Sequence, residues 1–85
     1  MASKYSVFTT GKADKNLESL PADDRERMLE SILALGDDPR PPGSRKLQGR
    51  EGYRLRVGNY RALYLIDEGL SEVTIHRIGH RQGIY

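Results

Sequence analysis

Residues 53–66 constrain the fold more than any other stretch of this chain, because their apolar side chains follow a period of two. Three apolar residues alternate with Arg54 and Arg56, Gly58 and Asn59 then supply a tight turn, and an apolar run resumes after the turn. Alternation of this kind around a two-residue turn predicts a β-hairpin with one face buried. The hairpin strands are therefore expected at residues 53–57 and 60–66.

A strand and two amphipathic helices are predicted ahead of this hairpin. The run from Tyr5 to Phe8 is strand-like, and Thr9-Thr10-Gly11 after it offers a hydroxyl N-cap for a helix. Pro21 ends that helix and suits the first turn of the next one. Apolar residues recur at helical spacing, namely Ala13, Leu17 and Leu20 in the first helix and Met28, Leu29, Ile32, Leu33 and Leu35 in the second.

The remaining segments complete an α+β domain. Residues 40–52 are rich in proline and glycine, so we predict an irregular connection there, of a length that is often functional. Asp67-Glu68-Gly69 makes a second turn, and Glu72 to Ile78 supplies a last strand. The predicted order is β-α-α-β-β-β, with the N-terminal helical hairpin packed on a small, mostly antiparallel sheet. Residues 1–85 are expected to form one domain.

Composition narrows the function classes. With no cysteine, the chain has neither a disulfide framework nor a thiolate nucleophile or zinc site. No acidic cluster or histidine pair in the sequence suits a catalytic metal, so we expect no cofactor. No run approaches the length of a membrane span, and the first residues lack the apolar core of a signal peptide. We therefore expect a soluble, unprocessed cytoplasmic protein without a membrane partner.

Charge is divided unevenly along the chain. Residues 1–43 carry 6 Lys and Arg against 8 Asp and Glu, whereas residues 44–85 carry 8 against 4. All but one of the eight bases in the second half are arginine, whose planar guanidinium matches phosphate oxygens in a bidentate fork. This asymmetry suggests an anionic ligand, and the alternative is a merely solvated charged face.

The hairpin pairing brings arginines together. With a two-residue turn, Arg56 lies opposite Arg61, and Arg54 shares their face. Like charges directly opposite on a sheet destabilise it by up to about 1 kcal/mol, so the pairing suggests a phosphate site. The alternative is that these side chains are solvated or paired with carboxylates such as Glu51 and Asp67 or Glu72. A three-residue turn would move Arg61 to the other face.

These motifs, in their order, resemble the RelE branch of the RelE/ParE toxin superfamily. The resemblance covers nearly the whole chain and includes the helical hairpin. The residues that carry it run in the order Lys46-Leu47-Gln48-Gly49, Tyr53-Arg54-Leu55-Arg56, Tyr60-Arg61-Ala62-Leu63-Tyr64, Gly79-His80-Arg81 and Tyr85.

The resemblance implies a toxin of a type II toxin–antitoxin pair that cleaves messenger RNA on the ribosome, without a metal, by attack of a ribose 2′-hydroxyl on the neighbouring phosphate. It also implies a cognate antitoxin as partner. The residues that it assigns to catalysis are Arg54, Arg56, Arg61, Arg81 and Tyr85.

The general base is a separate question, because many relatives have lysine where this chain has Arg54 and Arg56. Arginine, with a pKa above about 12, does not serve as a base. The candidates are Tyr85, whose phenol pKa nearby guanidinium groups would lower, and His80, whose ordinary pKa of about 6.5 suits proton transfer. We favour Tyr85 and keep His80 as the alternative.

Other basic and aromatic residues have different expected roles. Arg45, Lys46 and Arg50 are candidates for sequence-independent contacts to the RNA backbone. The tyrosines of the hairpin face away from the arginines in the predicted pairing and are expected to pack in the core, namely Tyr53, Tyr60 and Tyr64.

Two rival functions remain open. The ParE branch shares the fold but acts on DNA gyrase and lacks the catalytic arginine and tyrosine set, and the segment from Gly79 to Tyr85 argues against it. The second rival is an inactive relative that binds only RNA or the antitoxin, which the lysine-to-arginine differences keep open.

Overall fold

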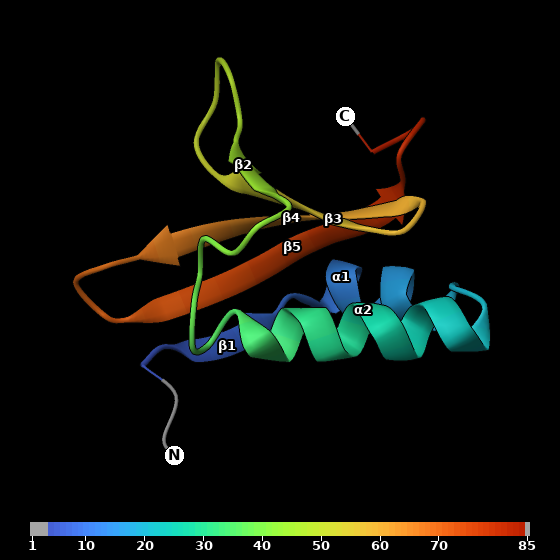
Figure 1. The fold of residues 1–85 in the computed structure, drawn as a ribbon, viewed down its shortest axis with the longest axis horizontal. Coiled ribbons are helices and arrows are strands. Elements are labelled where there is room, and N and C mark those ends of the chain that lie inside the picture. The colour runs from blue at the N-terminus through green and yellow to red at the C-terminus, as the bar shows by residue number, and fades with distance from the viewer. Residues whose placement is uncertain (1–3, 85) are drawn as a thin grey trace.

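The computed structural model describes residues 4–84 and has two helices on one face of a five-stranded sheet (Figure 1). The strands are β1 (Ser6–Thr9), β2 (Ser44–Lys46), β3 (Tyr53–Val57), β4 (Tyr60–Asp67) and β5 (Glu72–His80). The helices are α1 (Gly11–Glu18) and α2 (Ala22–Ala34). The predicted order of elements is confirmed, with one strand more than the sequence analysis expected.

The sheet has the order β1-β5-β4-β3-β2. Strand β1 runs parallel to β5, and every other pair is antiparallel. The additional strand, β2, lies at one edge within the stretch predicted to be irregular. Its three residues pair with β3, as in Ser44 opposite Leu55, so pairing with the next strand rather than its own residue propensity defines it.

Local chemistry sets the start of each helix. The Thr10 hydroxyl accepts a hydrogen bond from the Ala13 amide at 3.2 Å and caps α1, as the Thr9-Thr10-Gly11 motif predicts. Pro21 immediately precedes α2, where its fixed φ suits the entry to a helix. Strand β1 pairs only with residues 72–75 of β5, and α1 covers the edge of β5 beyond them. There the Asn16 side chain accepts a hydrogen bond from the Ile78 amide at 3.1 Å.

The core lies between the helices and the sheet. Met28, Ile32 and Leu35 of the predicted α2 stripe are fully buried there, but Leu29 and Leu33 are 43% and 60% exposed. The prediction that these two belong to the buried stripe was therefore wrong: the sheet covers only a narrow face of α2. The predicted packing of the tyrosines is confirmed, with Tyr64 fully buried and Tyr53 and Tyr60 packed against the core.

The other face of the sheet carries no helix (Figure 1). The loop between β2 and β3 rises from this open face, and so does the segment after β5. None of the helices in residues 4–84 is long and apolar enough to cross a membrane.

Candidate functional site

The hairpin register places the arginines as the sequence predicted. Arg56 lies opposite Arg61 and Val57 opposite Tyr60, with Gly58 and Asn59 between the strands. Gly58 has a positive φ of 60°, which a two-residue hairpin turn requires. Arg54, two residues before Arg56, projects from the same open face.

A second like-charged pair extends this face. Arg45 of β2 lies directly opposite Arg54, so the open face holds two arginine pairs at adjacent rows of the sheet. Each opposed pair of like charges costs up to about 1 kcal/mol. Repeating such a pair on one face is difficult to explain by folding alone and indicates a surface that binds an anion.

A bulge in β5 brings one further arginine to the open face. Leu63 pairs with Arg77, whereas Tyr64 pairs with Ile75, so the register shifts by one residue between them. Without the shift, alternation from Ile75 would point Arg77 into the core. Arg77 was not among the site residues predicted from the sequence, in which its only signal is the apolar Ile78 one step out of phase.

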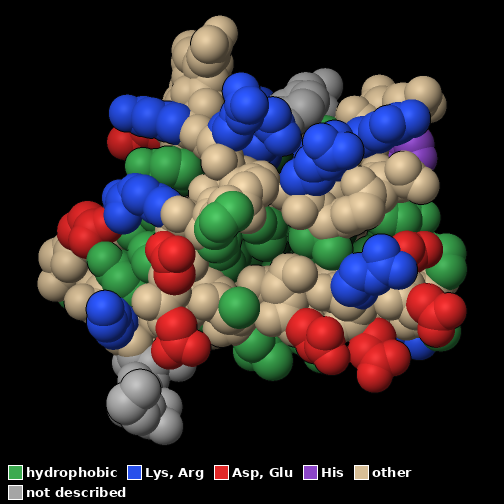
Figure 2. Space-filling view, viewed as in Figure 1, with side chains coloured by type: hydrophobic (Ala, Val, Ile, Leu, Met, Phe, Trp, Pro, Cys, Tyr) green, Lys and Arg blue, Asp and Glu red, His purple; other side chains and the backbone are tan. Residues whose placement is uncertain are grey.

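The cations meet in a cleft of about 570 Å³ between the β2–β3 loop and the segment after β5. Six of its eight lining residues are basic, and none is acidic. The lining consists of Arg45, Lys46, Leu47, Gln48, Arg50, Arg54, Arg61 and Arg81. Figure 2 shows the same separation at the molecular surface, with most Lys and Arg side chains above and most acidic side chains along α2 below.

Most arginines that line the cleft have no carboxylate partner among the described residues. Within residues 4–84, the one ion pair joins Arg40 to Glu68, outside the cleft, so Arg45, Arg50, Arg54 and Arg81 have no carboxylate partner there. The Arg61 guanidinium donates to the carbonyl oxygens of Tyr60 and Gly58, at 3.1 and 3.4 Å. These contacts orient the Arg61 side chain.

The floor beside these arginines is apolar. Leu63 lies in the row between Arg54 and Arg77 and has no exposed surface, although it is outside the main core cluster. A charge beside such a low-dielectric floor interacts with an anion more strongly than in water.

The other predicted site residues are placed differently. Arg56 shares the open face but does not line the cleft. His80 lies opposite Tyr60, on the face away from the arginines, with the two rings edge to face at 5.6 Å. Its Nδ1 atom accepts a hydrogen bond from the Gln82 amide at 3.3 Å. Tyr85 lies outside the described residues.

His76, at the β5 bulge, is half-buried, and its electrostatic setting is distinct. Burial lowers the pKa of its imidazole, and the charges of Arg50, Arg77 and Lys12 lower it further. The neutral imidazole is therefore the favoured form near neutral pH. His76 was not among the site residues predicted from the sequence.

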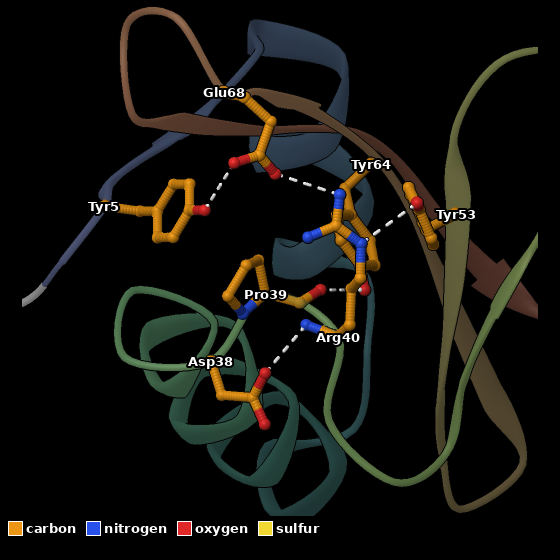
Figure 3. A network of polar contacts seen from close by, with 7 residues as sticks. All are labelled: Tyr5, Asp38, Pro39, Arg40, Tyr53, Tyr64 and Glu68. Carbon is orange, nitrogen blue, oxygen red and sulfur yellow. Dashed lines mark hydrogen bonds and ion pairs between the residues drawn. The ribbon is translucent and has the colours of Figure 1, made fainter.

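Arg40, which does not line the cleft, has compensated charge and belongs to a network of polar contacts (Figure 3). Its guanidinium donates to Glu68 at 2.9 Å and to the Tyr53 hydroxyl at 3.1 Å. The Tyr5 hydroxyl donates to the same carboxylate at 2.7 Å. These hydrogen bonds lower the pKa of Glu68, and the bond from Tyr5 contributes more than the bond from Arg40.

The network continues into the core through Tyr64, whose hydroxyl donates to the Pro39 carbonyl at 2.7 Å (Figure 3). Burial raises the pKa of the Tyr64 phenol. This network fixes the start of the connection between α2 and β2.

Within residues 4–84 no three His, Asp or Glu side chains gather in a way that would hold a metal ion.

The structure thus defines a small α+β protein with a cationic cleft on the open face of its sheet. Comparison with known proteins agrees. Residues 7–85 match the family model described as ParE toxin of type II toxin-antitoxin system, parDE. The chain is 37% identical over 89 residues to Toxin RelG of Mycobacterium tuberculosis, with 95% of each protein covered.

Solved structures agree as well. The RelBE2 toxin–antitoxin complex from Mycobacterium tuberculosis contains a chain with a TM-score of 0.81 and 31% identity, over 92% of this chain and 99% of that one. The archaeal RelE–RelB complex from Pyrococcus horikoshii gives a TM-score of 0.83 and 29% identity, over 94% and 98%. The chain belongs to the RelE/ParE superfamily of type II toxins and is RelE-like.

Proposed function

We propose that this protein is a ribosome-dependent messenger RNA endonuclease that binds the RNA backbone in its cationic cleft. The observation that carries the proposal is the cleft lining, in which six of eight residues are basic and none is acidic. A phosphodiester backbone is the polyanion that such a lining matches, and arginine binds its oxygens in a bidentate fork.

The proposed reaction is attack of a ribose 2′-hydroxyl on the adjacent phosphorus. The P–O5′ bond breaks, leaving a 2′,3′-cyclic phosphate and a 5′-hydroxyl. Negative charge builds on the phosphoryl oxygens in the transition state, and preorganised cations stabilise it. We assign this role to Arg61 and Arg54, with Arg56 as an outer contact. Arg81 is assigned to stabilise the departing 5′-oxygen, which takes its proton from water to give the 5′-hydroxyl.

The proton of the 2′-hydroxyl needs an acceptor. We propose Tyr85, with guanidinium groups lowering the pKa of its phenol. The alternative base, His80, is less well supported, because its ring packs against Tyr60 on the face away from the cleft and its Nδ1 is engaged by Gln82. We also propose that Arg45, Lys46 and Arg50, the rim cations of the cleft, make sequence-independent contacts to the RNA backbone.

The proposed partners are the ribosome with its messenger RNA, in the cytoplasm, and a cognate antitoxin. The solved structures from Mycobacterium tuberculosis and Pyrococcus horikoshii are both toxin–antitoxin complexes, which supports the second partner. An antitoxin segment that covers the cleft would need carboxylates to compensate its cations, and it would add buried surface to a small core.

A second candidate is a gyrase-binding toxin without nuclease activity. The description of the matching family model as a ParE toxin favours it. The two candidates predict different consequences of expression, since only the nuclease cuts messenger RNA.

The test is induced expression of the chain in bacteria, followed by primer extension on a reporter message. Wild type should arrest growth and produce cuts confined to translated codons, whereas Arg61→Ala and Arg81→Ala should greatly reduce both. Tyr85→Phe should do the same, because it removes the proton acceptor. Growth arrest without cuts would reject the nuclease and favour gyrase as the target.

A further inference from the structure

Ile84 is buried in an unusual place. Its side chain is only 1% exposed, yet Arg81, Gln82 and Gly83 before it are all exposed. Ile84 also lies outside the main core cluster between the helices and the sheet. The chain therefore leaves the sheet after β5, turns in solvent, and returns to bury one apolar side chain.

The surface that receives Ile84 is Gly79. A Cβ atom on Gly79 would lie 3.1 Å from Ile84 Cδ1 and 3.8 Å from Ile84 Cβ. Gly79 does not have a positive φ, so its backbone does not require glycine. The missing side chain instead leaves room for close approach, a known use of glycine within a strand.

This contact lies on the open face, beside the proposed active site. Gly79 is the cross-strand partner of Arg61, and cross-strand partners project from the same face of a sheet. Ile84 therefore packs on the arginine side of β5. The turn that it closes contains Arg81, which lines the cleft together with Arg61.

Among residues 4–84, few other hydrogen bonds hold the turn at residues 81–83 in place. The Arg81 amide donates to the Asn59 carbonyl at 2.9 Å, at the tip of the β3–β4 hairpin. The other hydrogen bonds of the turn among residues 4–84 are internal to it, from the Gly83 amide to the His80 carbonyl and from the Gln82 amide to His80 Nδ1. Exposed bonds of this kind open easily without an apolar anchor.

We propose that Ile84, seated on Gly79, is a positioning residue that holds Arg81 against the cleft. Ile84 does not touch the reacting groups and acts by keeping the turn closed. The proposed nuclease activity is the basis for the catalytic part of this inference. The structural part, that the Ile84 contact closes the turn, stands independently of it.

Two variants test the contact from opposite sides. Ile84→Ala empties the space over Gly79, and Gly79→Val fills that space from the strand and expels Ile84. Each should lower the single-turnover rate of messenger RNA cleavage on programmed ribosomes by about 10- to 100-fold, because misplacement by about 1 Å can cost that much. Apparent affinity for the ribosome should change less than about twofold, since the rim cations are unaltered.

The double variant provides the sharper test. Both changes sever the same contact, so Ile84→Ala with Gly79→Val should be no slower than the slower single variant. Ile84→Val, which keeps the Cβ contact, should retain most of the activity. Ile66→Ala is the matched control: it truncates an isoleucine that packs against the main core, and the cleavage rate should stay near that of wild type.

Hydrogen exchange of the Arg81 amide gives a readout besides cleavage. Ile84→Ala should accelerate its exchange strongly while core amides of β4 keep their protection, and Ile66→Ala should not. Unchanged exchange and an unchanged rate in Ile84→Ala would overturn the inference. If wild type cleaves nothing but the Arg81 amide still responds, the anchor stands and the nuclease proposal fails.

Discussion

Arg40 and the arginines of the cleft have the same side chain in opposite settings. Arg40 has its charge compensated by Glu68 and its guanidinium held by the Tyr53 hydroxyl (Figure 3). Arg54 lies opposite another arginine and has no carboxylate partner within residues 4–84. The first arginine completes a structural network, whereas the second keeps its charge available for a ligand. The neighbouring side chains, and not the residue type, therefore decide whether an arginine is structural or available to bind a ligand.

The largest expected effect separates these two arginines directly. Arg54→Ala should lower messenger RNA cleavage by about 10²- to 10³-fold, the usual cost of removing one preorganised donor to a transition state. Arg40→Ala should leave the cleavage rate within about twofold and instead lower the free energy of unfolding by about 1 kcal/mol. Cleavage assays and urea denaturation of both variants measure the contrast, and a large rate loss in Arg40→Ala would contradict it.

The next effect concerns salt. Removing three rim cations together, as Arg45→Ala, Lys46→Ala and Arg50→Ala, should weaken RNA binding and reduce the slope of log affinity against log salt concentration by about 2, at about 0.7 per phosphate contact. The matched control removes three cations on the helix side, Lys12, Lys15 and Arg25. Equal slopes for the two triple variants would mean that only net charge matters. The measurement is a fluorescence titration with single-stranded RNA.

A smaller effect should appear in the Arg40 network. Tyr64→Phe removes the hydrogen bond to the Pro39 carbonyl and leaves that acceptor unpaired in the core, so the free energy of unfolding should fall by about 1 to 2 kcal/mol. Cleavage at a temperature where the variant is fully folded should match wild type. Thermal unfolding monitored by circular dichroism checks the first point, and an unchanged melting temperature would contradict it.

The smallest effect is a pH dependence. Hydrogen bonds from Tyr5 and Arg40 lower the pKa of Glu68 in the folded state, so the stabilisation is present above its unfolded pKa of about 4.3. That stabilisation is lost as the pH falls through the lower, folded-state pKa. The unfolding free energy of Glu68→Gln should therefore fall less steeply than that of wild type below about pH 4.5. Glu72→Gln, outside this network, should follow wild type in the same denaturation series.

The hairpin and its arginine face were predictable from the sequence. The period of two in residues 53–57, followed by Gly58 and Asn59, favours a two-residue turn, and the register that this turn sets determines which arginines meet. The same reasoning placed the tyrosines in the core. Helix caps were also local signals, as Thr10 illustrates.

Features that depend on contact with another segment were not predictable in this way. Strand β2 forms because β3 offers it a partner, although its own residues lie among prolines and glycines. The β5 bulge that turns Arg77 outward depends on pairing with β4. The burial of Ile84 depends on an absent side chain at Gly79, which no local pattern reveals.

The position of β5 in the sheet has a consequence for the order of folding. This strand is the last in sequence, yet it lies between β1 and β4, where Ser6 pairs with Glu72. A nascent chain cannot attach β1 to the hairpin until residues 72–80 have been synthesised. Long-range pairing of this kind closes late and folds slowly. The ribosome that makes this protein therefore finishes most of the chain before all five strands can pair in one sheet.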